Sequence, residues 1–139
     1  MNRIWTVCIF ITLICVNTVF AQKASLHSVK IEWESFSTET FRAVSCDDFE
    51  SSFLDTRKYC VISKKPELTR LSSLRISKLF KTEKEFKSID VRGKIIFSYS
   101  NSTVKYCFDQ FGHFYYREAL FNNKSLWAFI INTIPKADQ

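Results

Sequence analysis

Glycine and proline are scarce in this chain, with two of each among 139 residues, and it has neither an internal repeat nor a low-complexity tract. Disordered chains are poor in hydrophobic residues, whereas 46% of these residues are hydrophobic and 16% are aromatic. The composition therefore predicts a folded protein. Its length fits one domain with one main core.

Motifs of enzyme catalysis are also absent. The sequence has no G-x-S-x-G, H-E-x-x-H, Walker, EF-hand or C-x-x-C pattern. The two histidines, His27 and His113, are predicted to lie at the surface because no partner is evident for either. Helix capping explains two of the nearby acids Asp47, Asp48 and Glu50 without a glycosidase-like pair. We assign no catalytic, cofactor-binding or metal-ligating residue, and a non-enzymatic protein is favoured, although distant segments can assemble a catalytic site.

A hydrophobic run long enough to span a membrane is missing as well. The apolar run Ile4–Val16 falls short of the roughly 18 residues expected of a spanning helix. It follows Arg3 and precedes Val19-Phe20-Ala21, which fits a signal-peptidase site. We therefore expect residues 1–21 to be a cleaved signal peptide and residues 22–139 to be a single exported domain, periplasmic or secreted, with no stable membrane insertion after cleavage.

Cysteines are few once the predicted signal peptide is removed. Cys8 and Cys15 leave with the signal, so the exported chain keeps Cys46, Cys60 and Cys107. An oxidising compartment allows these three at most one internal disulfide, and the third thiol stays free or pairs with another chain. All three pairings remain open at this point, because a disulfide requires alpha carbons within about 7 Å.

Charge is divided unevenly along the chain. The net charge is +6, or +5 without Arg3 of the signal. Residues 32–55 contain seven acids against one base, whereas residues 64–94 contain ten bases against four acids. The basic segment suits an acidic partner, but a solvated face that complements the acidic half is the simpler interpretation. No nucleic-acid-binding motif accompanies it, so nucleic acid is not an expected partner.

Apolar periodicity predicts most of the elements. Val29, Ile31 and Trp33 alternate with charged residues, which is typical of a half-buried strand over 28–34. Pro66 suits the first position of a helix carrying Leu68, Leu71 and Ile76 on one side. Weaker patterns predict a strand over 41–45, a helix over 48–53 capped by Asp47 with Phe49 and Phe53 one turn apart, a strand over 59–63, and a helical turn over 83–87.

The clearest pattern is a hairpin over 94–109 that turns at Asn101-Ser102. Pairing across that turn sets Phe97 opposite Tyr106 and Ile95 opposite Phe108. Six apolar side chains then share one face, and a slip of one residue would destroy this segregation. They are Ile95, Phe97, Tyr99, Val104, Tyr106 and Phe108. Ile96 and Cys107 make the other face apolar at its base, so we expect that end to be covered. A third strand over 114–117 is predicted after Gly112.

The chain ends in a predicted amphipathic helix. Asn122 or Asn123 caps it, Pro135 stops it, and its apolar side chains recur at helical spacing. These are Leu126, Trp127, Ile130, Ile131 and Ile134. Because this helix needs a sheet to pack on, the predicted fold is α+β, a small and mostly antiparallel sheet with short helices and the C-terminal helix packed on it.

Two N-glycosylation patterns begin at Asn101 and Asn123. Both fall where turns are predicted. They would be occupied only if the chain passes through a eukaryotic secretory pathway.

Several short segments, taken in order, resemble small uncharacterised exported proteins of Gram-negative bacteria. They are Phe20-Ala21-Gln22, Cys46–Glu50, Asp90–Ile95, Tyr106–Asp109 and Asn123–Leu126. The resemblance implies a periplasmic or secreted α+β domain and carries no known activity or catalytic residue. The three cysteines and two glycosylation patterns leave a eukaryotic secreted protein open.

The leading functional prediction is a non-enzymatic exported domain that binds another protein, as an inhibitor, immunity factor or envelope accessory. The alternative is a small secreted hydrolase or ligand-binding domain whose pocket lies beside Tyr99, Tyr106, Tyr115 and Tyr116, although tyrosines at this spacing more often pack a sheet. A third hypothesis is structural association through the unpaired cysteine. No cofactor is expected, and the sequence does not define an oligomeric state.

Overall fold

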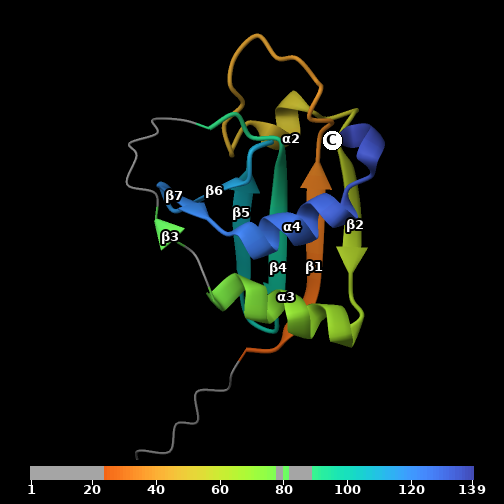
Figure 1. Ribbon diagram of the computed structural model, residues 1–139, viewed down its shortest axis with the longest axis vertical. Coiled ribbons are helices and arrows are strands. Elements are labelled where there is room, and N and C mark those ends of the chain that lie inside the picture. The colour runs from red at the N-terminus through yellow and green to blue at the C-terminus, as the bar shows by residue number, and fades with distance from the viewer. Residues whose placement is uncertain (1–23, 78–79, 82–88) are drawn as a thin grey trace, which may run out of the picture.

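A computed structural model of the chain describes residues 24–77, 80–81 and 89–139. They form an antiparallel sheet with short helices, including the C-terminal helix, which confirms the predicted α+β fold (Figure 1). The strand order is β2-β1-β4-β5-β6-β7-β3. The strands are Leu26–Trp33 (β1), Lys58–Ile62 (β2), Phe80–Lys81 (β3), Gly93–Tyr99 (β4), Thr103–Phe108 (β5), His113–Tyr116 (β6) and Ala119–Asn122 (β7). The helices are Phe49–Ser52 (α2), Lys65–Ser77 (α3), Lys124–Thr133 (α4) and the 3-10 turn Lys136–Asp138 (η1).

Strand β1 lies between β2 and β4 and carries the alternation seen in its sequence. Val29, Ile31 and Trp33 belong to the main core and are at most 5% exposed. The other face is not solvated at the end of the strand, because Glu32 and Glu34 are buried too. The prediction of a half-buried strand is therefore wrong at this end, where a second layer covers the sheet.

Helices α3 and α4 cover the front of the sheet in Figure 1. In α3, Leu68 and Leu71 are buried in the main core, as predicted, and the helix begins at Lys65, one residue before Pro66. The side chain of Ile76 lies outside the described residues.

Helix α4 agrees closely with its prediction. Asn123 is the cap, since its Oδ1 accepts a hydrogen bond from Leu126 N at 3.0 Å. Leu126 and Ile130 are fully buried, and the helix ends at Thr133, two residues before Pro135.

The predicted face of the β4–β5 hairpin is confirmed, but the predicted pairing is wrong by two residues. Phe97 lies opposite Val104, and Ile95 lies opposite Tyr106. A shift of two residues keeps every side chain on its face, so a period-2 pattern cannot reveal it. The observed register places Gly93 opposite Phe108, where a Cβ atom on residue 93 would lie 2.5 Å from Phe108 Cε2. Glycine at this position thus lets the Phe108 ring lie against the backbone of β4.

The turn of this hairpin lies one residue earlier than predicted. Tyr99 N donates to Ser102 O at 2.8 Å, so Ser100 and Asn101 form the turn. A type I′ turn needs a positive φ at both central residues, and neither Ser100 nor Asn101 adopts one. The strand predicted after Gly112 is present as β6, and β6 and β7 form a further hairpin that was not predicted.

Helix α2 and the segment before it form the second layer, behind the sheet. Phe49 and Phe53 pack edge to face, with ring centroids 5.4 Å apart, in a core with Val44, Val91 and Cys107. This layer covers the Cys107 end of the hairpin, as expected.

Two local predictions near α2 are wrong, and a third, farther along the chain, lies outside the described residues. The cap is Asp48 rather than Asp47, and its side chain makes no capping bond; Asp48 N instead donates to Ser45 Oγ at 3.1 Å. Residues 41–45 form a loop rather than a strand, because the backbone of Val44 binds Asp90 and Val91 rather than a sheet edge. The helical turn predicted over 83–87 lies outside the described residues.

Candidate functional site

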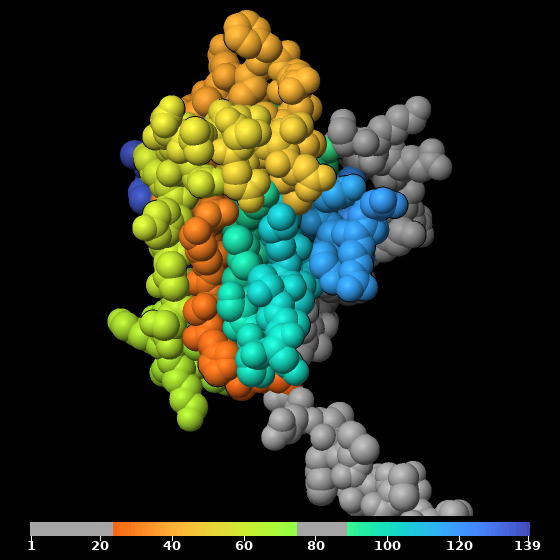
Figure 2. All heavy atoms as spheres, turned by 180° about the vertical axis from the view of Figure 1, so that it is seen from behind, coloured from red at the N-terminus to blue at the C-terminus, as the bar shows by residue number. Residues whose placement is uncertain are grey.

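The longest loop within the first described segment runs from residue 34 to residue 45 and is called the apical loop below. It leaves the end of β1 and stands above the sheet beside α2, as the orange atoms at the top of Figure 2 show. Its far end is fixed by two hydrogen bonds of the Val44 backbone. Val44 N donates to Asp90 Oδ1 at 2.9 Å, and Val91 N donates to Val44 O at 2.9 Å.

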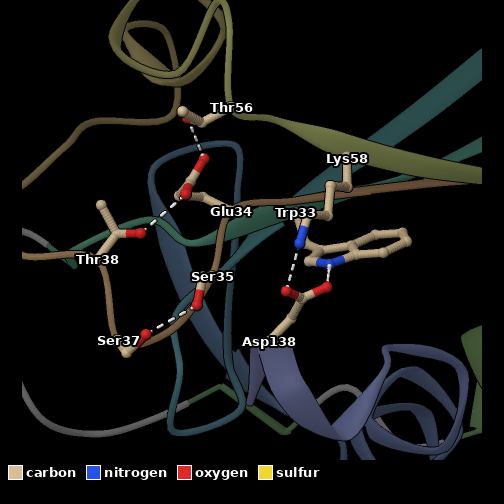
Figure 3. A network of polar contacts seen from close by, with 8 residues as sticks. All are labelled: Trp33, Glu34, Ser35, Ser37, Thr38, Thr56, Lys58 and Asp138. Carbon is tan, nitrogen blue, oxygen red and sulfur yellow. Dashed lines mark hydrogen bonds and ion pairs between the residues drawn. The ribbon is translucent and has the colours of Figure 1, made fainter.

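A buried carboxylate fixes the near end of the apical loop. Glu34 is 4% exposed and accepts hydrogen bonds from Thr38 Oγ1 at 2.8 Å and Thr56 Oγ1 at 2.5 Å (Figure 3). Thr38 belongs to the loop and Thr56 to the segment between α2 and β2. Glu34 therefore ties the loop to the chain that follows α2.

A second carboxylate, Asp138, fixes the C-terminus beside the same loop. Its two oxygens accept from Trp33 Nε1 at 3.1 Å and from Lys58 Nζ at 2.5 Å (Figure 3). These bonds, first the one from Lys58 and then the one from Trp33, lower the pKa of Asp138. Phe36 N donates to Asp138 O at 2.8 Å, so η1 directly supports the start of the loop.

The apical loop exposes an aromatic side chain. Phe41 is fully exposed, with a relative accessibility of 114%. Leu54 and Phe111, which follow α2 and β5, are 70% and 71% exposed. The apical loop, α2 and the turn after β5 all lie at the end of the sheet where β1 ends and β4 begins. Three large exposed hydrophobic side chains thus come from segments at this apical end.

A polar cleft of about 560 Å³ lies beneath the apical loop. Residues 36–43 line it together with Asp90, Arg92 and Gln110. Arg92 is 6% exposed, and its Nη2 binds Asp90 Oδ2 at 2.5 Å and Thr40 Oγ1 at 3.3 Å. Its Nε and Nη1 have no hydrogen-bond partner among the described residues. The cleft therefore combines a buried, incompletely bonded guanidinium with a carboxylate.

An ion pair between a fully buried lysine and a partly exposed glutamate supports the second layer. Lys94 of β4 is 0% exposed, and its Nζ pairs with Glu50 Oε2 of α2 and lies 5.4 Å from the Phe49 ring centroid. Burial lowers the pKa of Lys94 despite this partner. Burial is the largest single effect on the pKa of Glu50 and raises it, but the hydrogen bonds from Lys94 and the backbone and the charges of Lys94 and Lys105 together lower the pKa. This pair fixes α2, and it opens onto neither cleft.

The structure selects one of the three cysteine pairings. Cys46 and Cys107 form a disulfide with alpha carbons 5.8 Å apart. Cys60 of β2 is the free cysteine of the described residues and is partly buried. Burial raises the pKa of its thiol.

The four tyrosines of the alternative prediction do not converge. Tyr106 and Tyr116 pack together with ring centroids 4.8 Å apart, and both they and Tyr99 contact the main core. Tyr115 contacts the second core on the other face. A second cleft, of about 510 Å³, lies between residues 24–26 and α3, and no tyrosine lines it or the cleft below the apical loop.

The two glycosylation patterns differ in accessibility. Asn101 is exposed in the β4–β5 turn, whereas Asn123 is 2% exposed. Besides capping α4, Asn123 Nδ2 donates to Leu74 O at 2.8 Å. The folded protein therefore offers Asn101 to solvent and keeps Asn123 engaged.

The two histidines also differ. His27 is exposed, as expected. His113 Nδ1 lies 2.7 Å from Asp109 Oδ2, and Asp109 Oδ1 accepts from the backbone N of Phe111 and of His113. His113 was predicted to lie at the surface; it is partly exposed, and it has a carboxylate partner that the sequence did not reveal. The Asp109–His113 pair closes the turn after β5.

The described residues contain neither a metal-binding cluster nor a membrane-spanning helix. Within residues 24–77, 80–81 and 89–139, no group of His, Cys, Asp and Glu has the arrangement of a metal site. In the same part of the chain, no helix combines the length and apolar character needed to cross a bilayer. Comparison with protein-family models, curated proteins and solved structures found no match. The similarity to small exported proteins of Gram-negative bacteria stays a prediction.

Sequence reasoning missed Phe41 and Arg92 as site residues. Phe41 was assigned to a strand, and Arg92 was counted only within the basic segment. No local pattern could have distinguished them, because the loop that brings them to one cleft is closed by contacts with residues 56, 90 and 138.

Proposed function

We propose that this protein is an exported, non-enzymatic domain that binds another protein through its apical loop. The observation that supports the proposal best is the full exposure of Phe41 on a loop held at both ends by partly buried hydrogen bonds. Burying such a ring in a partner would remove a large apolar surface from water.

The hydrogen bonds that order both ends of the apical loop favour tight binding. A loop that is already ordered loses little conformational entropy when it binds. Glu34 and Asp138 order the near end of the loop and Asp90 orders the far end. Arg42, next to Phe41, is exposed. Aromatic and arginine side chains dominate the energetics of protein interfaces, so Phe41 and Arg42 are the expected anchors.

Export is the second part of the proposal. It depends on the basic start, apolar run and cleavage pattern of residues 1–21. The disulfide between Cys46 and Cys107 suits an oxidising compartment. N-terminal sequencing of material recovered outside the cytosol should begin at Gln22, and retention of Met1 would contradict export by a cleaved signal.

The binding proposal is tested by comparing variants rather than by capture alone. The exported protein is immobilised and exposed to the envelope or secretome fraction of its host at moderate salt. Partners retained by the wild type should be lost with Phe41→Ser and weakened with Arg42→Ala. They should be retained with Lys105→Ala, which changes an exposed charge on β5 outside the apical loop. Retention of the same proteins by all variants, or of none by the wild type, would contradict the proposal.

A second candidate function is the binding of a small anionic ligand in the cleft. Arg92 favours it, because two of its nitrogen atoms are buried without a partner and such atoms cost about 1–3 kcal/mol each. A ligand carboxylate could supply the missing acceptors. Isothermal titration with a panel of carboxylates and phosphates tests this function. Binding by the wild type that is lost in Arg92→Lys, with melting unchanged, would favour ligand binding over protein recognition.

A further inference from the structure

Strand β2 forms one free edge of the described sheet. It pairs with β1 alone. In Figure 1 the C-terminal segment lies beside the beginning of β2, and no other described strand lies along its outer edge. Its residues on the back face, Tyr59 and Val61, are 65% and 57% exposed. Proteins normally protect such an edge with proline, a bulge or inward charges, since exposed backbone groups pair with other strands. In β2 the only charged residue is Lys58, at its beginning, where it is bound to Asp138.

The sequence of β2 is complementary to itself when it is turned around. The strand has five residues, and Cys60 is the central one. In an antiparallel pair of two copies centred on Cys60, Tyr59 of each copy lies opposite Val61 of the other. An aromatic residue opposite a β-branched one is a favourable cross-strand pair. Lys58 would face Ile62, so no like charges would meet.

The position of Cys60 would allow a disulfide between the two copies in this arrangement. It lies opposite Ile31 of β1, on the face of the main core, and its thiol is not used by the intramolecular disulfide. Directly opposite residues of antiparallel strands have alpha carbons about 4.5–5.5 Å apart, within the range that a disulfide spans. The two Cys60 thiols of a pair would therefore lie within bonding distance of each other.

We propose that a second copy of this chain docks on β2, with the two β2 strands antiparallel and centred on Cys60, so that one sheet continues through both copies. The surface involved is separate from the apical loop, so the dimer would present two apical loops. A second copy is the proposed occupant because it supplies the complementary order Tyr59-Cys60-Val61 in the reverse direction.

A charge exchange tests the partner and the register together. The exported wild-type protein should have the mass of a dimer in sedimentation equilibrium. Tyr59→Lys with Val61→Lys sets two lysines opposite two lysines and should yield a monomer. Tyr59→Lys with Val61→Glu sets each lysine opposite a glutamate and should restore the dimer, with a dependence on salt. Both variants change only exposed positions, and unchanged melting of the monomeric form would show that the fold is intact.

Trapping with oxidised glutathione provides the second measurement. Two Cys60 thiols lose two protons and two electrons to oxidised glutathione, which forms the intermolecular disulfide and two molecules of reduced glutathione. The wild type should give a covalent dimer on a non-reducing gel, and Cys60→Ser should give none while remaining a dimer in sedimentation. Thr103→Lys, on an exposed position of β5, is the matched control and should be trapped like the wild type.

Three results would overturn the proposal. They are a monomeric wild type at the highest soluble concentration, an equal loss of dimer in both charge variants, and a mixed disulfide of Cys60 with glutathione in place of the covalent dimer. The last result would indicate an accessible edge that does not pair with itself. Because the measurements need no binding partner, their failure is distinguishable from failure of the proposed function.

Discussion

Trp33 and Asp138 lie 105 residues apart in the sequence, yet the indole Nε1 of Trp33 donates a hydrogen bond to Asp138 Oδ2 at 3.1 Å. The contact joins the end of the first described strand to the penultimate residue of the chain. With Lys58 on the other oxygen, Asp138 brings three distant segments together at the base of the apical loop (Figure 3). The C-terminus is thus part of the support of the candidate binding surface.

The pH dependence of stability should report on Asp138. Its pKa is lowered, first by Lys58 and then by Trp33, so its stabilising effect is complete above the ordinary aspartate pKa of about 3.9 and is lost as the pH falls through the lowered value. Thermal melting of the wild type and of Asp138→Asn should therefore differ most at neutral pH and converge in acid. A difference that does not change with pH would contradict this role.

Removal of the disulfide should be strongly destabilising. Cys46 and Cys107 are 61 residues apart, and closing a loop of that length contributes about 4 kcal/mol. Cys46→Ala with Cys107→Ala should lower the free energy of unfolding by about 3–4 kcal/mol in urea denaturation. Dithiothreitol should destabilise the wild type and Cys60→Ala equally and should not affect the double variant.

The buried pair of Lys94 and Glu50 should be asymmetric under mutation. Glu50→Gln leaves a fully buried ammonium without its counter-charge, and we expect a loss of about 2 kcal/mol, below the 3–5 kcal/mol of a fully buried pair because Glu50 is 43% exposed. Burial already lowers the pKa of Lys94 in the folded protein. Between this lowered pKa and the ordinary lysine pKa of about 10.4, the unfolded chain binds more protons than the folded chain. The stability lost in Glu50→Gln should therefore be partly regained as the pH rises through this interval.

A matched double variant isolates the charge effect. Lys94→Met with Glu50→Gln should recover most of the loss at neutral pH, because no buried charge is left. Equal instability of the single and double variants would assign the loss to altered packing of α2 instead.

Trp127 should contribute strongly although it is not fully buried. Its ring contacts Phe36 and Phe108 at centroid distances of 5.9 and 5.8 Å. Trp127→Ala should cost about 3 kcal/mol, at the lower limit of the usual range for tryptophan because the ring is partly exposed. Wild-type melting of this variant would contradict the packing of α4 against the apical loop.

Gly112→Ala should be destabilising for two separate reasons. Gly112 has a φ of +86°, which costs an alanine about 1–2 kcal/mol, and the added Cβ would lie 2.7 Å from Trp127 Cγ. Combining Gly112→Ala with Trp127→Ala should remove the steric clash. In urea denaturation, the double variant should therefore lose less free energy of unfolding than the sum of the losses of the two single variants.

The turn between β6 and β7 should be improvable. Arg117 and Glu118 adopt φ of 46° and 62°, a type I′ arrangement that Asn-Gly fits far better. Arg117→Asn with Glu118→Gly should raise the free energy of unfolding by about 1 kcal/mol. The same pair of substitutions at Ser100 and Asn101, where φ is not positive, should give no such gain.

Alternation and helical spacing predicted the elements whose apolar faces are set locally. Strand β1, the faces of β4 and β5, the cap at Asn123 and the buried side of α4 all follow from residues close in sequence. A period-2 pattern fixes the face of a strand because each residue step reverses the side chain. The same property leaves registers two residues apart indistinguishable, so the pairing of Phe97 needed the tertiary structure.

Contacts between distant residues decided the rest. The partner of Cys107, the burial of Glu34 and Lys94, and the placement of Phe41 above Arg92 depend on which segments the closed chain brings together. Composition and local pattern thus determined a folded α+β chain and its main apolar faces, since hydrophobic burial acts through periodicity. Only the tertiary structure decided the second layer, the disulfide and the candidate surfaces, because hydrogen bonds and ion pairs act over a few ångströms between residues whose separation in sequence carries no signal.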